Sequence, residues 1–156
     1  MVQEKRQRVL FLCTGNSCRS HMAEAVVNHY LGHKWQAVSA GTHPAGYVHP
    51  RALQVLEEIG IEHTGRSKHV NHFQDETFDL VVTVCDQASE ECPVWLGHGK
   101  VIHNGYQDPA EATGTTGEIL SAFREVRDLI KKEIPRVLKN YQQEHKSKQE
   151  SEGRDD

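Results

Sequence analysis

Apolar runs of strand length alternate with segments of helical periodicity along this chain. Residues 8–13 form an almost unbroken apolar run, which predicts a central parallel strand buried on both faces. A polar, glycine-containing stretch follows, and Ser20 lies where the N-terminus of a helix favours a hydroxyl. Beyond it, apolar and aromatic side chains repeat at helical spacing at Met22, Ala25, Val26, His29 and Tyr30. The chain therefore opens as strand, loop and helix.

The same alternation continues through the rest of the sequence. Strands are predicted over 35–40, ended by Gly41, over 80–84, which is rich in β-branched residues, and more weakly over 100–103. Helices are predicted over about 50–59, stopped by Gly60, over a short segment 88–92 before Pro93, and from about 115 to 141, where Pro135 should kink or divide the helix.

Strands that alternate with helices predict an α/β fold, a three-layer sandwich with a parallel sheet. Residues 1–141 are expected to form one domain, whereas 142–156 are charged and nearly devoid of apolar side chains, which predicts a disordered tail. Ligands of such folds bind at the carboxyl ends of the strands. Cys13 and Cys85 each follow a predicted strand directly, so two sulfur atoms are expected at one edge of the sheet.

Composition narrows the class of protein. The chain has 156 residues and a formal net charge of -4, without the basic and aromatic surface pattern of nucleic-acid binders. No apolar run approaches about 18 residues, and the first eight residues are too polar for a signal peptide. We expect a cytoplasmic monomer that binds neither nucleic acid nor membrane. Because that compartment is reducing, its four cysteines are expected to be reactive rather than structural.

The most specific motif places a cysteine at a strand end and an arginine five residues later, in the first turn of a helix. Successive backbone N–H groups of such a loop can surround a tetrahedral oxyanion, and the helix N-terminus adds its dipole. Arg19 can hold two oxygens of that anion, and the Ser20 hydroxyl can stabilise the thiolate of Cys13. Gly15 would permit the turn, and Asn16 tolerates left-handed backbone angles. The predicted oxyanion-binding residues are Thr14, Gly15, Asn16, Ser17, Cys18, Arg19 and Ser20.

The same residue types are compatible with other structures and roles. The loop alone is compatible with a tight turn around an ordinary buried cysteine, and Cys18 is expected to be structural. Zinc binding is disfavoured because neither Cys-x4-Cys nor Cys-x6-Cys is the usual ligand spacing, so no metal is expected. Surface or capping roles are favoured over metal ligation for the eleven histidines, including the close pairs His29 with His33 and His69 with His72.

The Cys-x5-Arg-Ser motif, together with Asp108-Pro109 far downstream, resembles the low-molecular-weight protein tyrosine phosphatases from about residue 8 to residue 141. The resemblance implies a four-stranded parallel sheet flanked by helices. It also implies that Cys13 is the nucleophile, that Arg19 holds the oxyanion and that Asp108 is the general acid. A positioned carboxyl is chemically reasonable there, since expulsion of an oxygen leaving group near neutral pH requires a proton donor.

The segment from Cys85 to Cys92 and Pro93 resembles the redox segment of thioredoxin-coupled arsenate reductases of the same superfamily. Their likeness extends to the whole anion loop and to Ala110, where the tyrosine phosphatases tend to carry an aromatic residue. The resemblance implies that Cys13 attacks arsenate, Cys85 then attacks Cys13 as arsenite leaves, and Cys92 finally takes over the disulfide, which thioredoxin reduces. No cofactor is implied.

Helical geometry adds a prediction about this segment. Seven residues apart on a helix, Cys85 and Cys92 would lie about 10 Å from each other. A disulfide tolerates only about 7 Å between Cα atoms. The predicted short helix should therefore unwind when the disulfide forms. Two unrelated buried thiols remain an alternative reading of the pair.

Some thioredoxin-coupled members carry a potassium site near the anion loop, and Asn16, Glu24 and Ser39 match three of its ligand positions. Lys68 stands where an acid would complete it, so potassium-independent activity is expected. The runner-up function is a phosphatase that hydrolyses phosphate monoesters, since the loop alone does not distinguish phosphate from arsenate. A non-catalytic anion- or redox-sensing module is a third possibility, disfavoured by the presence of Cys13, Arg19 and Asp108 together. Thioredoxin is favoured over glutaredoxin as reductant by resemblance alone.

Overall fold

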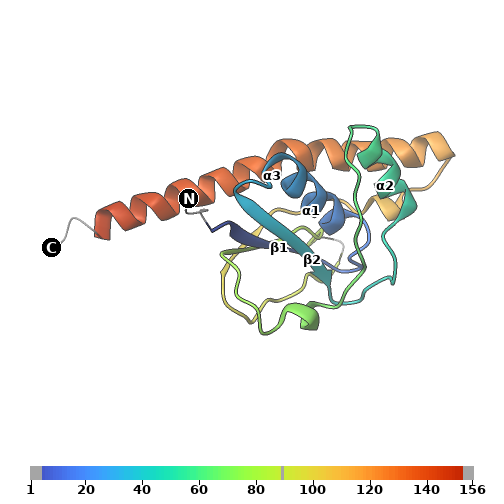
Figure 1. Ribbon diagram of the computed structural model, residues 1–156. Coiled ribbons are helices and arrows are strands. Elements are labelled where there is room, and N and C mark those ends of the chain that lie inside the picture. The colour runs from blue at the N-terminus through green and yellow to red at the C-terminus, as the bar shows by residue number, and fades with distance from the viewer. Residues whose placement is uncertain (1–4, 89, 153–156) are drawn as a thin grey trace.

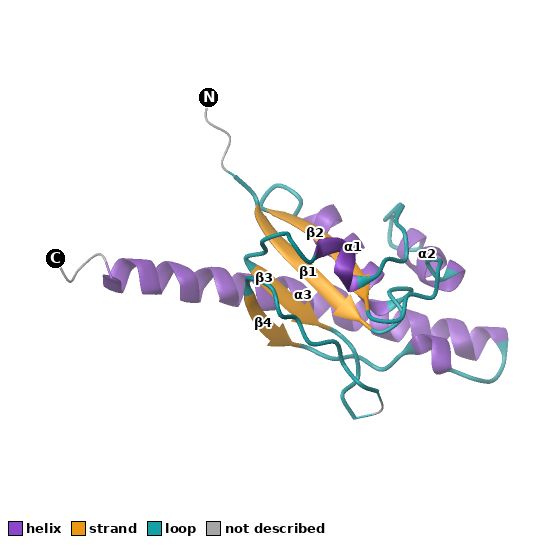
Figure 2. Ribbon diagram, turned by 90° about the horizontal axis from the view of Figure 1, so that it is seen from below, coloured by secondary structure: helices purple, strands orange, loops and turns teal. Residues whose placement is uncertain are grey.

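The computed structural model describes residues 5–88 and 90–152 and contains one parallel sheet (Figure 1). Its strands are β1 (Gln7–Cys13), β2 (Trp35–Gly41), β3 (Leu80–Thr83) and β4 (Lys100–His103), arranged in the order β2-β1-β3-β4. Figure 2 shows them side by side, with β4 at one edge. The predicted α/β fold with a four-stranded parallel sheet is confirmed.

Alternation of side chains along β1 explains why both faces of the sheet are buried. Val9 and Phe11 point into the larger core, whereas Leu10 and Leu12 point into the smaller one, and all four are 0% exposed. The larger core holds α1 (Arg19–Tyr30), α2 (Pro50–Glu57) and α3 (Thr116–Glu152), which all pack on one face. The opposite face is covered by the 3₁₀ helix η1 (Val70–Phe73) and by loops that contribute Phe78 and Trp95. The third layer therefore contains no α-helix among the described residues.

The long C-terminal helix differs from the prediction in two ways. Pro135 does not divide α3, because Ile130, Ile134 and Leu138 are 0% exposed on both sides of it and their packing outweighs one lost backbone hydrogen bond. The helix also continues to Glu152 through most of the predicted disordered tail. Lysine, glutamine and glutamate extend an already nucleated helix at little cost. Residues 153–156 of that predicted tail lie outside the described residues.

The short helix predicted over 88–92 is absent from the described part of that segment, which forms a turn and a bend. The N–H of Glu90 donates to the carbonyl oxygen of Asp86 at 3.0 Å, which makes one isolated turn. Ser89 lies outside the described residues. None of the helices in the described ranges is both long enough and apolar enough to cross a membrane.

Candidate active site

The loop between β1 and α1 is shaped by Asn16 rather than by Gly15. Asn16 is 0% exposed and has a φ of 44°, the left-handed conformation that its side chain was predicted to tolerate. Gly15 does not have a positive φ, and a Cβ atom there would meet nothing within 4 Å. Gly15 was expected to permit the turn, but the unusual backbone angle of the loop lies at Asn16.

A chain of hydrogen bonds leads from the loop to the sulfur of Cys13. The backbone N–H of Lys68 donates to Oδ1 of Asn16 at 2.8 Å, and Nδ2 of Asn16 donates to Oγ of Ser20 at 2.8 Å. Since Ser20 accepts from Asn16, its own proton is free to point at Sγ of Cys13, 2.9 Å away. The Ser20 hydroxyl is thus placed to donate a hydrogen bond to the sulfur of Cys13.

Neighbouring segments hold the loop from outside, which the sequence analysis did not anticipate. The carbonyl oxygens of Thr14, Gly15 and Ser17 accept hydrogen bonds of 2.9, 2.9 and 3.1 Å from backbone N–H groups of the segment 43–49. A Cβ atom on Gly41 would approach the carbonyl oxygen of Thr14 to 2.4 Å, so only glycine fits at the end of β2. Two segments, residues 41–49 and the one that contains Lys68, therefore fix the shape of the loop.

Cys18 behaves as the structural residue that its position suggested. Its side chain is 4% exposed and belongs to the larger core. Burial raises the pKa of the Cys18 thiol to about 12, with the negative charges of Asp108 and Cys13 acting in the same direction. A thiol held in this neutral form is a poor nucleophile.

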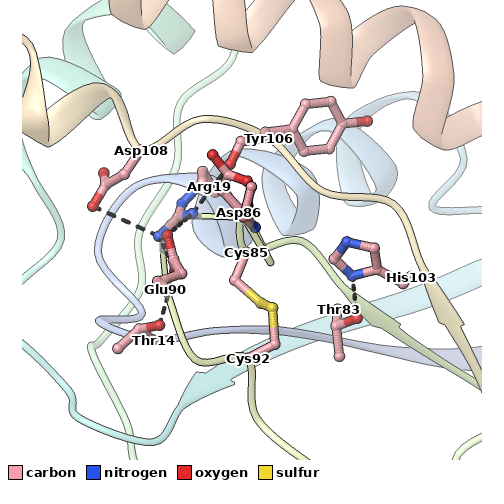
Figure 3. Close-up of a disulfide and its surroundings, with 11 residues drawn as sticks. Thr14, Arg19, Thr83, Cys85, Asp86, Glu90, Cys92, His103, Tyr106 and Asp108 are labelled. Atoms are coloured by element: carbon pink, nitrogen blue, oxygen red, sulfur yellow. Dashed lines mark hydrogen bonds and ion pairs between the residues drawn. A yellow bond between two sulfur atoms is a disulfide. The ribbon is translucent and has the colours of Figure 1, made fainter.

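Arg19 is the first residue of α1. Its guanidinium is bound by an acidic side chain from the segment between Cys85 and Cys92. Nη1 and Nη2 of Arg19 lie 2.8 and 2.9 Å from Oε2 and Oε1 of Glu90 (Figure 3). Thr14 also donates to Oε1 of Glu90 at 2.8 Å. Glu90 stands in an acidic run 71 residues after Arg19, and sequence reasoning did not single it out.

Asp108 approaches Arg19 from the other side. Its Oδ2 atom lies 3.6 Å from Nη2 of Arg19, and its side chain is 27% exposed. Oδ1 of Asp108 accepts a hydrogen bond of 3.0 Å from the N–H of Ala110 and so caps the 3₁₀ helix η2 (Pro109–Glu111). Thr14, Arg19, Glu90 and Asp108 line one open cleft of about 1190 Å³. Asp108, predicted as the general acid, and Arg19, predicted to bind the oxyanion, therefore lie next to each other.

Cys85 and Cys92 are joined in a disulfide with a Cα–Cα distance of 5.8 Å. Figure 3 shows this bond below the Arg19 side chain, at the edge where β1 and β3 end. Cys85 is 0% exposed, whereas Cys92 is partly exposed. The reading of 85 and 92 as unrelated buried thiols is therefore wrong. The predicted helix between the two cysteines is absent among the described residues when the disulfide is formed, as the limit on the Cα–Cα distance requires.

Behind the loop lies the set of residues matched to a potassium site. Oγ of Ser39 donates to Oε1 of Glu24 at 3.0 Å, while Asn16 is engaged by Ser20 and Lys68. Burial raises the pKa of Glu24 to about 7, although the charge of Lys68 and the hydrogen bond from Ser39 act in the opposite direction. The Lys68 ammonium donates to the carbonyl oxygen of Arg66 at 2.9 Å. The positive charge of Lys68 therefore acts on Glu24, and the two side chains influence each other's pKa.

Two histidines that the sequence analysis did not single out complete this buried group. Nδ1 of His21 lies 3.0 Å from Nε2 of His63, and Nε2 of His21 lies 3.1 Å from the carbonyl oxygen of Arg66. Ligand atoms of His21, Glu24 and His63 lie within 4.8 Å of one another, a grouping that suits a metal ion in composition. Burial and the charge of Lys68 lower the pKa of both imidazoles, and the same charge opposes a bound cation.

The predicted capping role is confirmed for one of the singled-out histidines. Nδ1 of His69 accepts the N–H of Asn71 at 3.0 Å and caps η1. His49 does the same for Arg51 at the start of α2. Cys85, Cys92 and His103 also have ligand atoms within 4.8 Å of one another, but both sulfurs are consumed by the disulfide.

The chain matches the low molecular weight phosphotyrosine protein phosphatase family over residues 8–148. An arsenate reductase of Halalkalibacterium halodurans is 43% identical over 127 residues, which cover 81% of this chain and 91% of that protein.

Solved structures are similar over most of the chain. A thioredoxin-dependent arsenate reductase of Corynebacterium glutamicum has a TM-score of 0.61 at 26% identity, covering 92% of this chain and 65% of that one. A low molecular weight protein tyrosine phosphatase of T. tengcongensis has a TM-score of 0.65 at 25% identity, covering 86% and 99%. With its sheet, its anion loop and this match in sequence, the chain belongs to the low molecular weight phosphotyrosine protein phosphatase family.

Proposed function

We propose that this protein is an arsenate reductase that converts arsenate to arsenite through Cys13, Cys85 and Cys92. The observation that carries the proposal is the Cys85–Cys92 disulfide, formed at the same sheet edge as an anion loop with a free Cys13. A hydrolase of this fold needs the loop but has no use for a redox pair beside it. The 43% identical arsenate reductase relative supports the same substrate.

Atoms and electrons balance in each step of the proposed thiol–disulfide relay. The Cys13 thiolate attacks arsenic, and water leaves with a proton from Asp108, giving a cysteinyl-arsenate. The Cys85 thiolate then attacks Sγ of Cys13, so the S–As bond breaks, its electron pair reduces arsenic(V) to arsenic(III), and arsenite departs. Cys92 attacks Cys85 in the resulting disulfide and releases the Cys13 thiolate. The disulfide in this structure corresponds to the last state of that sequence.

The remaining loop residues bind and orient the oxyanion in this proposal. Backbone N–H groups of residues 14–19 and the N-terminus of α1 surround the anion, while Arg19 holds two of its oxygens. Thr14, Gly15, Asn16, Ser17, Cys18, Arg19 and Ser20 are therefore proposed as the oxyanion-binding residues, and no cofactor takes part. Ser20 acts through the Cys13 sulfur, 2.9 Å away.

We propose thioredoxin as the reductant, in a cytoplasmic, monomeric enzyme. The C. glutamicum structural relative is thioredoxin-dependent. Cys92 is the partly exposed sulfur of the pair, and it is followed by Val94 and Leu96, which are 77% and 92% exposed. Apolar side chains beside an accessible disulfide suit docking of a protein dithiol better than attack by a small thiol.

Cys92→Ser tests the relay. Turnover of arsenate with a thioredoxin system should collapse and a Cys13–Cys85 disulfide should accumulate, whereas hydrolysis of p-nitrophenyl phosphate should survive because it needs only the loop and Asp108. Cys18→Ala is the matched control. Cys18 contributes only its backbone N–H to the proposed oxyanion loop, and alanine keeps that group, while the thiol itself is buried and neutral, so arsenite release should persist. Full arsenate turnover in Cys92→Ser would refute the three-cysteine relay. Ester hydrolysis without any arsenate reduction by the wild-type protein would leave a phosphate-monoester phosphatase as the function. Parallel assays with glutathione and glutaredoxin identify the reductant.

A further inference from the structure

The carboxylate of Glu90 contacts the donors that an oxyanion substrate needs. Its two oxygens accept hydrogen bonds of 2.8 and 2.9 Å from two nitrogens of Arg19. This is the planar bidentate geometry in which a guanidinium binds arsenate or phosphate. One of these oxygens also accepts the Thr14 hydroxyl at 2.8 Å. With regard to Arg19 and Thr14, Glu90 therefore mimics the substrate (Figure 3).

Burial and charge show that this contact is more than a surface ion pair. The side chain of Arg19 is 3% exposed and that of Glu90 is 18% exposed. Burial disfavours the charged carboxylate, but hydrogen bonds from Arg19 and Thr14 outweigh it and hold the pKa of Glu90 below its ordinary value. Glu90 is thus an anion at neutral pH, and an incoming oxyanion must displace it to reach Arg19.

The position of Glu90 in the chain ties this contact to the redox state. Glu90 lies within the eight-residue loop that the Cys85–Cys92 bond closes, and its N–H is bonded to the carbonyl oxygen of Asp86. We propose that Glu90 is an internal competitor for the oxyanion site: the Cys85–Cys92 disulfide holds it on Arg19, and reduction of that disulfide releases it so that substrate can bind. This inference rests on the proposed function.

The relay gives such a competitor a purpose. Once Cys92 has taken over the disulfide, Cys13 is a free thiolate again and the loop is ready for another anion. An arsenate bound then would form a cysteinyl-arsenate with no Cys85 thiol to resolve it. Glu90 on Arg19 prevents this unproductive loading. When a dithiol reductant delivers two electrons and two protons, it becomes a disulfide itself, Cys85 and Cys92 become thiols, and the segment is free to refold.

Inorganic phosphate binding tests the proposal without turnover. Protein with the Cys85–Cys92 disulfide and fully reduced protein, each checked by thiol counting, are titrated by calorimetry at pH 7 in phosphate-free buffer. The reduced wild-type protein should bind phosphate about tenfold or more tightly than the oxidised form, since the oxidised form must first break charge-assisted hydrogen bonds. In Glu90→Gln the two redox states should bind phosphate with equal affinity, close to that of reduced wild type.

Glu91→Gln is the matched control. Glu91 is an exposed glutamate in the same disulfide loop, and its variant should keep the wild-type difference between redox states. Equal phosphate affinity of the two wild-type states, or a difference that persists in Glu90→Gln, would overturn the proposal while leaving the thiol relay intact. The comparison of the two wild-type states stands even if a variant does not fold. Failure of the reduced wild-type protein to bind phosphate would overturn the oxyanion site itself.

Discussion

The Sγ atom of Cys13 lies 2.9 Å from the Oγ atom of Ser20, and that hydroxyl is oriented by the side-chain amide of Asn16. Removal of the hydroxyl should therefore raise the free energy of the Cys13 thiolate. We expect Ser20→Ala to slow alkylation of Cys13 by iodoacetamide at pH 7 by about tenfold, the equivalent of one hydrogen bond to a charged group. Equal alkylation rates in Ser20→Ala and the wild-type protein would contradict this expectation.

Asn16 allows the backbone and side-chain contributions to be separated. Its φ of 44° is strained in alanine but not in glycine. Asn16→Gly should thus retain the fold and reproduce the alkylation defect of Ser20→Ala, whereas Asn16→Ala should also lower the melting temperature. Equal alkylation rates in Asn16→Gly and wild type would show that the amide does not orient Ser20.

Asp108→Asn should impair chemistry while it preserves structure. Asparagine can still accept the hydrogen bond from Ala110 that caps η2, but it cannot donate a proton to a leaving oxygen. Hydrolysis of p-nitrophenyl phosphate should fall by about 10²–10⁴-fold, in the range of general acid catalysis. Alkylation of Cys13 should continue at the wild-type rate. Unchanged hydrolysis would exclude Asp108 as the acid.

Local signals predicted the scaffold of the site, whereas contacts between distant segments were not readable from the sequence. The apolar run ending at Cys13 and the left-handed conformation of Asn16 depend on residues close in sequence. Glu90 contacts Arg19 across 71 residues, and in the sequence it cannot be distinguished from its neighbour Glu91. The tail beyond 142 was misjudged for a related reason. The composition of this segment is typical of disorder when the segment is considered alone. In the structure it continues α3, whose earlier turns are packed into the hydrophobic core.

The redox segment should change its secondary structure with its oxidation state. With the disulfide formed, the described residues of 86–93 contain no helix, because the two Cα atoms lie 5.8 Å apart. Once reduced, the segment is free to form the predicted helix over 88–92, and a helix that included both cysteines would separate them by about 10 Å. Amide exchange across 86–93 should therefore be slower in the reduced protein. Comparable exchange in both states would contradict this expectation.

Arsenate turnover should not depend on potassium. The charge of Lys68 acts on Glu24, His21 and His63, so it would repel a cation bound among these residues. Titration with potassium chloride should match titration with sodium chloride at equal ionic strength. A large activation specific to potassium would show that Lys68 swings away and does not replace the cation.

His21 should make the fold sensitive to acid. Burial, aided by the charges of His63 and Lys68, lowers the pKa of His21 to about 3, so the folded protein keeps it neutral while the unfolded chain takes up a proton below about 6.5. The stability that neutral His21 contributes is complete above pH 6.5 and is lost as pH falls towards 3. By pH 5 this loss should be about 2 kcal/mol. Denaturant unfolding of His21→Gln between pH 7.5 and 5 should show a flatter dependence than wild type. The exposed His29→Gln on the same helix should retain the wild-type slope, and a wild-type slope in His21→Gln would assign the acid sensitivity to other groups.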